Sequence, residues 1–101
     1  MEKDYFKDRP IEYITNPDCI EIGMEVYICE KIMQDIASEL SDLTRGVVIK
    51  KLTNHIHSRG VKVKVTASTG RREAIGRVTY ICNGDYVLTK DGWKLEKDVN
   101  K

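Results

Sequence analysis

The sequence predicts a mainly β protein, a small barrel of five or six antiparallel strands with one short helix between the first and second strands. Two observations lead to this prediction. Apolar and polar residues alternate with a period of two in several short runs, and turn residues such as Asn83-Gly84 separate these runs closely. Such alternation is typical of half-buried strands, and an Asn-Gly link is a strong hairpin signal because both positions tolerate a positive φ. Short strands joined by tight loops favour a small barrel over a layered α/β fold.

The third run gives the clearest strand, because valines at 61, 63 and 65 alternate with Lys62, Lys64 and Thr66. One face of this strand is therefore apolar and the other is basic. The full set of expected strands covers residues 24–29, 47–52, 61–66, 75–82, 86–88 and 93–95. We expect the barrel core to consist of Val26, Ile28, Val48, Leu52, Val61, Val63, Val65, Val78 and Ile81.

A short amphipathic helix is predicted within residues 32–43. The apolar residues Ile32, Ile36, Leu40 and Leu43 recur there at spacings of four and three among polar residues. This spacing places them on one face of a helix. We expect that face to cap an open end of the barrel.

The chain divides into an acidic arm, residues 1–19, and the barrel with its C-terminal hairpin, residues 20–101. The arm holds both prolines, and Asn16-Pro17-Asp18 is a turn signal, so we expect little regular structure there. No apolar run approaches the ~20 residues that span a bilayer, and the charged beginning of the chain does not indicate secretion. Cys19, Cys29 and Cys82 are odd in number and widely spaced, which fits reduced thiols. We therefore expect a cytoplasmic protein without a membrane partner.

Residues 20–81 carry the motifs of a known family. These are Ile20-x-x-Gly23-x-x-Val26-x-Ile28, Leu43-Thr44-Arg45-Gly46-x-Val48, Leu52-Thr53-Asn54, Gly60-Val61-Lys62-Val63-Lys64 and Gly76-Arg77-Val78. In them the chain resembles the YwbE-like family of small bacterial proteins, which implies an SH3-like barrel. The Gly-x-Val pattern is also similar to the KOW motif of ribosomal and transcription-factor barrels, many of which contact RNA. The family's His-Pro-His-Gly motif stands here as His57-Ser58-Arg59-Gly60, and the loops at residues 31–42 and 67–74 are longer.

Charge is sorted along the chain although the total is only +1. Residues 1–43 hold eleven acids against four bases, a net charge of −7, whereas residues 44–79 hold nine bases against one acid, a net charge of +8. The basic segment can meet a polyanion, or it can pair with the acidic segment of its own chain. We favour a nucleic-acid-binding module, for RNA or single-stranded DNA, whose phosphate contacts are Arg45, Lys50, Lys51, Lys62, Lys64, Arg71, Arg72 and Arg77. The alternative is a protein-interaction or accessory module that uses the barrel groove or the acidic arm.

Patterns of catalytic residues do not occur in the sequence. A nucleophile with its base, a carboxylate pair or a phosphate-binding glycine loop would be recognised by its spacing, so we expect no enzyme activity, no cofactor and no small-molecule substrate. His55 and His57 could bind a metal together with a cysteine, but two neighbouring loop histidines are the simpler interpretation. Tyr80, Tyr86 and Trp93 could stack on bases, although packing within the barrel is favoured.

Overall fold

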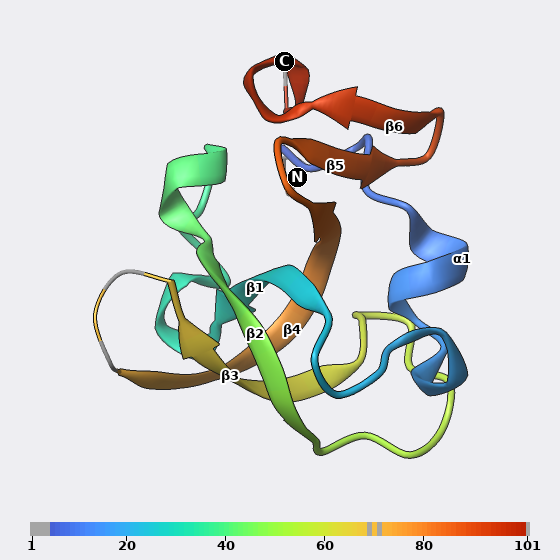
Figure 1. Cartoon of the computed structure of the whole chain (residues 1–101), viewed down its shortest axis with the longest axis vertical. Helices are drawn as coiled ribbons and strands as arrows, with labels where there is room; N and C mark the ends of the chain where they lie inside the picture. Colours follow the sequence, from blue (N-terminus) through green and yellow to red (C-terminus); the bar gives the residue numbers. More distant parts are fainter. Residues whose placement is uncertain (1–4, 69, 71, 101) are drawn as a thin grey trace.

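The computed structural model describes residues 5–68, 70 and 72–100, and its centre is a closed barrel of four antiparallel strands. Consecutive strands pair with each other, and β1 also pairs with β4, which closes the barrel. The last two strands form a hairpin that extends the sheet from β4 and stands above the barrel in Figure 1. The strands are β1 (Glu25–Glu30), β2 (Thr44–Lys51), β3 (Lys62–Ala67), β4 (Glu73–Asn83), β5 (Tyr86–Thr89) and β6 (Gly92–Leu95). The expected mainly β barrel is thus confirmed.

The barrel core contains the inward residues that the period-two alternation predicted, with one exception. Val26, Ile28, Val48, Val61, Val63, Val65, Val78 and Ile81 all lie in one buried cluster. Leu52 was wrongly expected there, since its side chain is 41% exposed. The register of β2 against β3 shifts between Val48 and Lys50, so that Lys50 lies opposite the outward-facing Lys64. A one-residue irregularity of this kind exchanges the two faces of a strand, and it turns Leu52 outward with Lys50.

The predicted helix at residues 32–43 is wrong. The segment contains two 3-10 turns instead, Lys31–Met33 and Leu40–Asp42, and Ile32 is 82% exposed. The carboxylate of Asp42 accepts hydrogen bonds from the backbone N–H groups of Ser38, at 3.0 Å, and Glu39, at 3.1 Å. These N–H groups are therefore not available to continue a helix, and the side chain starts a new turn in its place.

Residues 5–19 pack on the barrel, in contrast to the weakly structured arm that we expected. They contain the short helix α1 (Ile11–Ile14) and a 3-10 turn, Pro17–Cys19. Ile14 is fully buried in the core cluster with Ile20, and its carbonyl accepts a 2.7 Å hydrogen bond from the N–H of Val61. This segment therefore contributes part of the barrel's own core.

A second, smaller cluster lies between the barrel and the C-terminal hairpin. It contains Tyr27, Ala37, Leu43, Tyr80, Cys82, Val87 and Val99, with Phe6 packed against it. The last 3-10 turn, Glu96–Asp98, directs the chain back so that Val99 reaches this cluster. The hairpin is thereby fixed to the barrel by its own apolar contacts.

The hairpin after β4 is confirmed, but its turn is displaced by one residue from the expected Asn83-Gly84 link. Asn83 and Tyr86 are paired, so the two central residues are Gly84 and Asp85. Gly84 has a φ of 61°. Asp85 is not among the described residues with positive φ, which matches a turn with glycine at its first central position.

Candidate nucleic-acid interface

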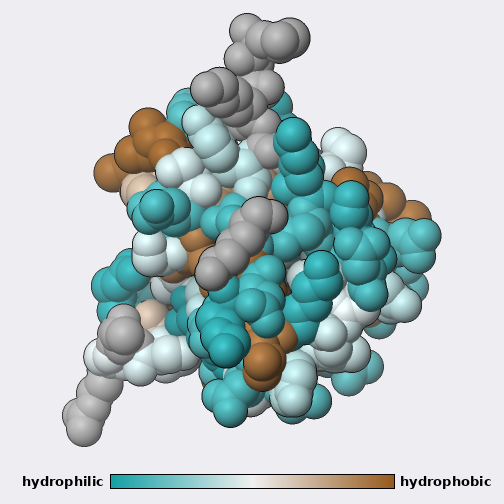
Figure 2. Space-filling model, turned by 90° about the horizontal axis from the view of Figure 1, so that it is seen from above, coloured by the Kyte–Doolittle hydropathy of each residue, from teal (hydrophilic) through white to brown (hydrophobic). Residues whose placement is uncertain are grey.

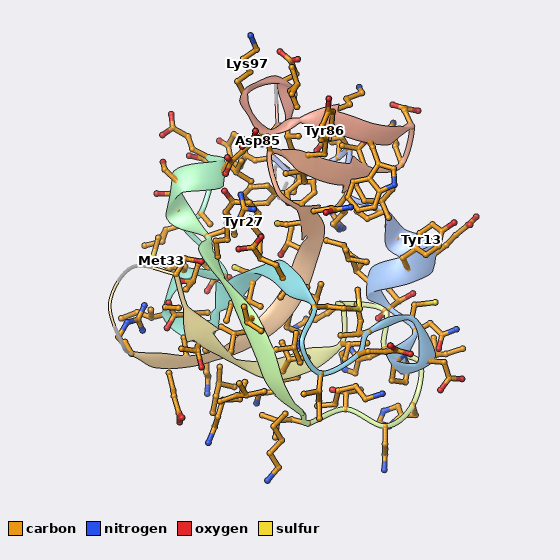
Figure 3. All side chains as sticks on the ribbon, viewed as in Figure 1. Tyr13, Tyr27, Met33, Asp85, Tyr86 and Lys97 are labelled. Carbon is orange, nitrogen blue, oxygen red and sulfur yellow. The ribbon has the colours of Figure 1, made fainter. Side chains whose placement is uncertain are left out.

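An open groove with four basic side chains lies on the outer face of β3 and β4. Its volume is about 460 Å³. The lining residues are Lys31, Gln34, Arg59, Lys62, Ile75, Gly76 and Arg77, and none of them is acidic. We call this feature the basic groove. In Figure 3, several nitrogen-tipped side chains project from the β2–β3–β4 side of the molecule, opposite to the C-terminal hairpin.

The strand register determines the position of Lys62 and Arg77 in the basic groove. Val63 is fully buried, so its neighbour Lys62 points to the outside of β3. Arg77 of β4 lies directly opposite Lys62, on the same face of the sheet. Neither residue forms an ion pair with a described carboxylate, and Arg77 instead donates a 3.2 Å hydrogen bond to the carbonyl of Gly60.

Lys31 reaches the groove because β1 and β4 approach each other closely at Gly76. Gly76 is the register partner of Glu30, the last residue of β1, and Lys31 follows directly. A Cβ atom on Gly76 would lie 2.5 Å from the carbonyl oxygen of Cys29, so only glycine fits this position. The close approach brings the start of the segment between β1 and β2 to the groove, which Lys31 and Gln34 line.

Arg59 enters the groove from the loop before β3, within the motif His57-Ser58-Arg59-Gly60. The backbone N–H of Arg59 donates a 3.2 Å hydrogen bond to Nδ1 of His57. Desolvation lowers the pKa of His57, and the positive charges of Arg77, His55 and Arg59 lower it further. A neutral imidazole therefore lies near Arg59 and Arg77 at neutral pH.

Lys50 and Lys64 extend the basic surface from the groove across β2. Lys64 lies on the same face of β3 as Lys62, and Lys50 is its direct partner on β2. Lys64 is within 3.7 Å of Glu73, whose side chain is largely exposed. Two pairs of like charges, Lys62 with Arg77 and Lys50 with Lys64, are thus arranged across neighbouring strands.

Arg45 was expected to contact phosphates, but the structure places it in a separate network. Its guanidinium lies 2.6 Å from Glu25 and 3.2 Å from Glu96, and it donates a 2.6 Å hydrogen bond to the carbonyl of Gly84. The group also lies over the ring of Tyr27 at 5.7 Å. The hydrogen bond to Glu25 raises the pKa of Arg45. This arginine fastens the C-terminal hairpin to the barrel.

The other expected contact residues also lie outside the groove. Arg72 pairs with Glu30 through two nitrogens, at 3.1 and 3.3 Å. Lys51 donates a 3.0 Å hydrogen bond to the carbonyl of Pro17. Arg71 lies outside the residues that the structure describes. The structure therefore gathers Lys62 and Arg77 in the groove, with Lys50 and Lys64 beside it, and leaves Arg45, Lys51 and Arg72 elsewhere.

The acidic arm does not neutralise the basic groove through its described carboxylates. Asp8 accepts hydrogen bonds from the hydroxyl of Tyr80 and, at 2.8 Å, from the backbone N–H of Asn100. In the described part of the chain, Glu12 and Asp18 form no ion pair with a groove residue. Pairing between the acidic and basic segments occurs instead at Arg45 and Arg72, through carboxylates of β1.

The aromatic residues considered for base stacking do not line the groove. Tyr80 is fully buried in the second core cluster, as packing predicts. Tyr86 and Trp93 are about half exposed, but they lie on the C-terminal hairpin. The rings of His55 and His57 are 6.2 Å apart. Within the described residues, no three histidine, cysteine or acidic side chains come together as a metal site requires.

Sequence reasoning missed Lys31, Gln34 and Arg59 as groove residues. Arg59 belongs to the basic segment and directly precedes Gly60 and the basic strand β3, which was a usable signal. Lys31 is surrounded by acids in the sequence, and nothing local distinguishes it. Its position follows from the closure of the barrel between β1 and β4, which only the fold reveals.

The fold and groove define a small antiparallel β-barrel with one basic surface. Residues 14–81 match the model of the family described as "Uncharacterized conserved protein (DUF2196)", and the chain belongs to this family. No curated protein and no solved structure matches the chain. In the described ranges, no helix has the length and apolar character needed to cross a membrane.

Proposed function

We propose that this protein is a non-enzymatic binding module for single-stranded nucleic acid, RNA or single-stranded DNA, and that the basic groove contacts the phosphates. The observation that carries the proposal is the convergence of Lys31, Arg59, Lys62 and Arg77 on one groove whose lining contains no acid. Phosphate oxygens are favourable partners for such cations, and the release of counterions from a neutralised polyanion supplies most of the free energy of non-specific binding.

The strand pairing of the bases supports a polyanionic ligand. Like charges directly opposite each other on neighbouring strands destabilise a sheet. Here Lys62 faces Arg77, and Lys50 faces Lys64. Glu73 partly offsets the charge of Lys64, but Lys62 and Arg77 pair with no described carboxylate, and a phosphate placed between them removes a repulsion that the free protein retains. The groove has no aromatic lining residue for base stacking, so binding rests on phosphate contacts, which do not read base identity.

We also propose that the protein belongs to the YwbE-like family and is located in the cytoplasm. The motifs shared with the YwbE-like family all lie inside the matched residues 14–81, and we take the two resemblances to describe one family of bacterial proteins. Cys19, Cys29 and Cys82 are free cysteines in the structure, in keeping with a reducing cytoplasm. The similarity to KOW barrels that contact RNA points to the same ligand class.

Fluorescence anisotropy with short labelled oligonucleotides at 50 and 200 mM salt tests this proposal. The wild-type affinity should fall with salt, with a slope of roughly −0.7 per phosphate contacted. The double substitution Arg59→Glu and Lys62→Glu should weaken binding to every sequence alike and flatten the slope by about one to two units. Both side chains are exposed, so the fold should tolerate the change.

A matched control makes the same charge change elsewhere. Lys90→Glu with Lys97→Glu alters two exposed lysines near the C-terminal hairpin, outside the groove lining. The control should bind nearly as the wild type does. If the wild type shows no binding at low salt, or if the control loses affinity as much as the groove variant does, the basic groove is not a nucleic-acid site.

A further inference from the structure

β6 is an edge strand, and the hydrogen-bond pattern between β5 and β6 shows which of its backbone groups point away from β5. β6 pairs only with β5 in the described part of the chain. The N–H of Glu96 donates a 2.9 Å hydrogen bond to the carbonyl of Asp85. Bonded and non-bonded residues alternate along an antiparallel ladder, so Gly92, Lys94 and Glu96 bond to β5. The N–H and C=O groups of Trp93 and Leu95 therefore point away from β5.

These outward groups have no described partner. No backbone or side-chain hydrogen bond reaches the main chain of Trp93 or Leu95 from any described residue. Such a row of unpaired groups is a template for another strand, and native proteins usually protect it with charge or proline. Here the two residues that carry the free groups are a tryptophan and a leucine.

An apolar surface accompanies the free edge. Trp93 is 49% exposed and its cross-strand neighbour is Leu88, whereas Leu95 is 37% exposed and lies opposite Tyr86. These four side chains share one face of the hairpin, on which Leu88 packs against the barrel core and the other three are at least 37% exposed. Figure 2 views the molecule from the hairpin side, where separate hydrophobic patches interrupt a largely hydrophilic surface. The edge thus combines backbone pairing groups with side chains that an incoming strand can cover.

We propose that β6 accepts an extended segment of a partner protein, which adds a strand to the sheet beside Trp93 and Leu95. The backbone groups of these two residues supply the hydrogen bonds of strand addition. The matching segment has two apolar residues, opposite Trp93 and Leu95, separated by one acidic residue opposite Lys94. This assignment is independent of the basic groove, because none of its residues lines that groove.

The charge of Lys94 favours an acidic segment of a different protein as the partner. One antiparallel pairing with a second copy, which joins Trp93 to Leu95, would place Lys94 opposite Lys94 on the two-fold axis. Like charges in direct opposition destabilise a strand pair. The Lys94 ammonium already lies 3.9 Å from Asp91, with 42% of the side chain exposed, and an acidic residue on an incoming strand can share it.

A proline substitution isolates the edge. Leu95 has a φ of −60° and a ψ of 142°, so Leu95→Pro fits the existing backbone. The change removes only an N–H that points outward and leaves the β5–β6 ladder intact. Leu95→Ala is the matched control, since it shortens the same side chain but keeps the N–H. Trp93 is the only tryptophan of the chain, so its fluorescence reports binding at this edge without a label.

The probe is a synthetic octapeptide in which valine alternates with glutamate, compared with a scrambled peptide of the same composition. Binding of the alternating peptide should shift Trp93 emission to shorter wavelength, and Leu95→Pro should weaken it roughly tenfold relative to Leu95→Ala. The Arg59→Glu and Lys62→Glu double variant should leave it unchanged. Equal binding of the scrambled peptide, loss of binding in the groove variant, or no binding at all would overturn the proposal. Sedimentation of the protein alone gives a further check, because a dimer abolished by Leu95→Pro would assign the edge to a second copy instead.

Discussion

At the scale of single residues, Lys62 is placed where it weakens the free protein. It lies opposite Arg77 across the β3–β4 ladder, and neither residue pairs with a described carboxylate. A surface that served only solubility would gain from a carboxylate at one of these two positions. The charge of Lys62 therefore lowers the stability of the free protein but raises its affinity for nucleic acid.

Lys62→Gln should accordingly stabilise the protein and weaken nucleic-acid binding. Removal of the repulsion with Arg77 should raise the free energy of unfolding by about 0.2–1 kcal/mol. Urea denaturation measures this change, and anisotropy measures the affinity. The matched variant Lys97→Gln removes a charge from an exposed lysine near β6 and should change neither quantity appreciably. A loss of stability in Lys62→Gln would contradict the repulsion argument.

Glu30 is a second residue whose charge matters, and its effect depends on pH. Hydrogen bonds from Arg72, and then from Thr44, lower the pKa of the Glu30 carboxyl in the folded protein. A lowered pKa contributes stability above the pKa of the unfolded state and loses it as the pH falls through the folded value. Glu30→Gln should therefore be less stable than the wild type at pH 7, and the difference should shrink below about pH 4.5. Thermal unfolding from pH 3 to pH 7 measures it, and a constant difference would refute this role.

At the scale of elements, all six strands could be predicted from the sequence, but two local irregularities could not. The alternation of valines in β3 identifies its faces directly. In β2 the same rule fails after Val48, because the register shift that turns Leu52 outward depends on the pairing with β3. The apolar spacing of residues 32–43 matched a helix, but it does not reveal that the Asp42 carboxylate binds the backbone there.

Helix α1 is the element whose role differs most from the sequence expectation. Its last residue, Ile14, is buried in the barrel core, whereas Ile11 at its start is exposed. Ile14→Ala should destabilise the protein by about 2–5 kcal/mol, the usual range for a buried isoleucine. Ile11→Ala, on the same helix, should cost less than about 0.5 kcal/mol. Equal effects of the two variants in chemical denaturation would mean that this segment is not part of the folded core.

At the scale of the whole molecule, the sequence predicts most of the basic residues of the candidate site. It does not predict which of them come together in the groove. The basic excess of residues 44–79 contains Arg59, Lys62 and Arg77, and the alternation of β3 places Lys62 on the outer face. Lys31 comes from the acidic half of the chain and joins them only because β1 pairs with β4. Arg45 and Arg72 lie outside the site and form ion pairs with carboxylates of β1. These pairs could not be predicted without the three-dimensional fold.

The assembled groove also predicts a pH dependence of binding that is centred on His57. Burial, with the nearby charges of Arg77, His55 and Arg59, lowers the pKa of His57, so the imidazole is neutral at pH 7 in the free protein. A bound polyanion offsets those positive charges and favours the protonated form, so binding takes up a proton and the affinity should rise as the pH falls from about 7 to 5.5. His57→Gln should keep the affinity measured at pH 7 but lose most of this increase. The matched variant His55→Gln, which changes a histidine farther from Arg59 in the sequence, should retain the greater part of it. Anisotropy titrations of all three proteins with one oligonucleotide at constant ionic strength make the comparison, and an unchanged pH profile in His57→Gln would place the phosphates elsewhere on the barrel.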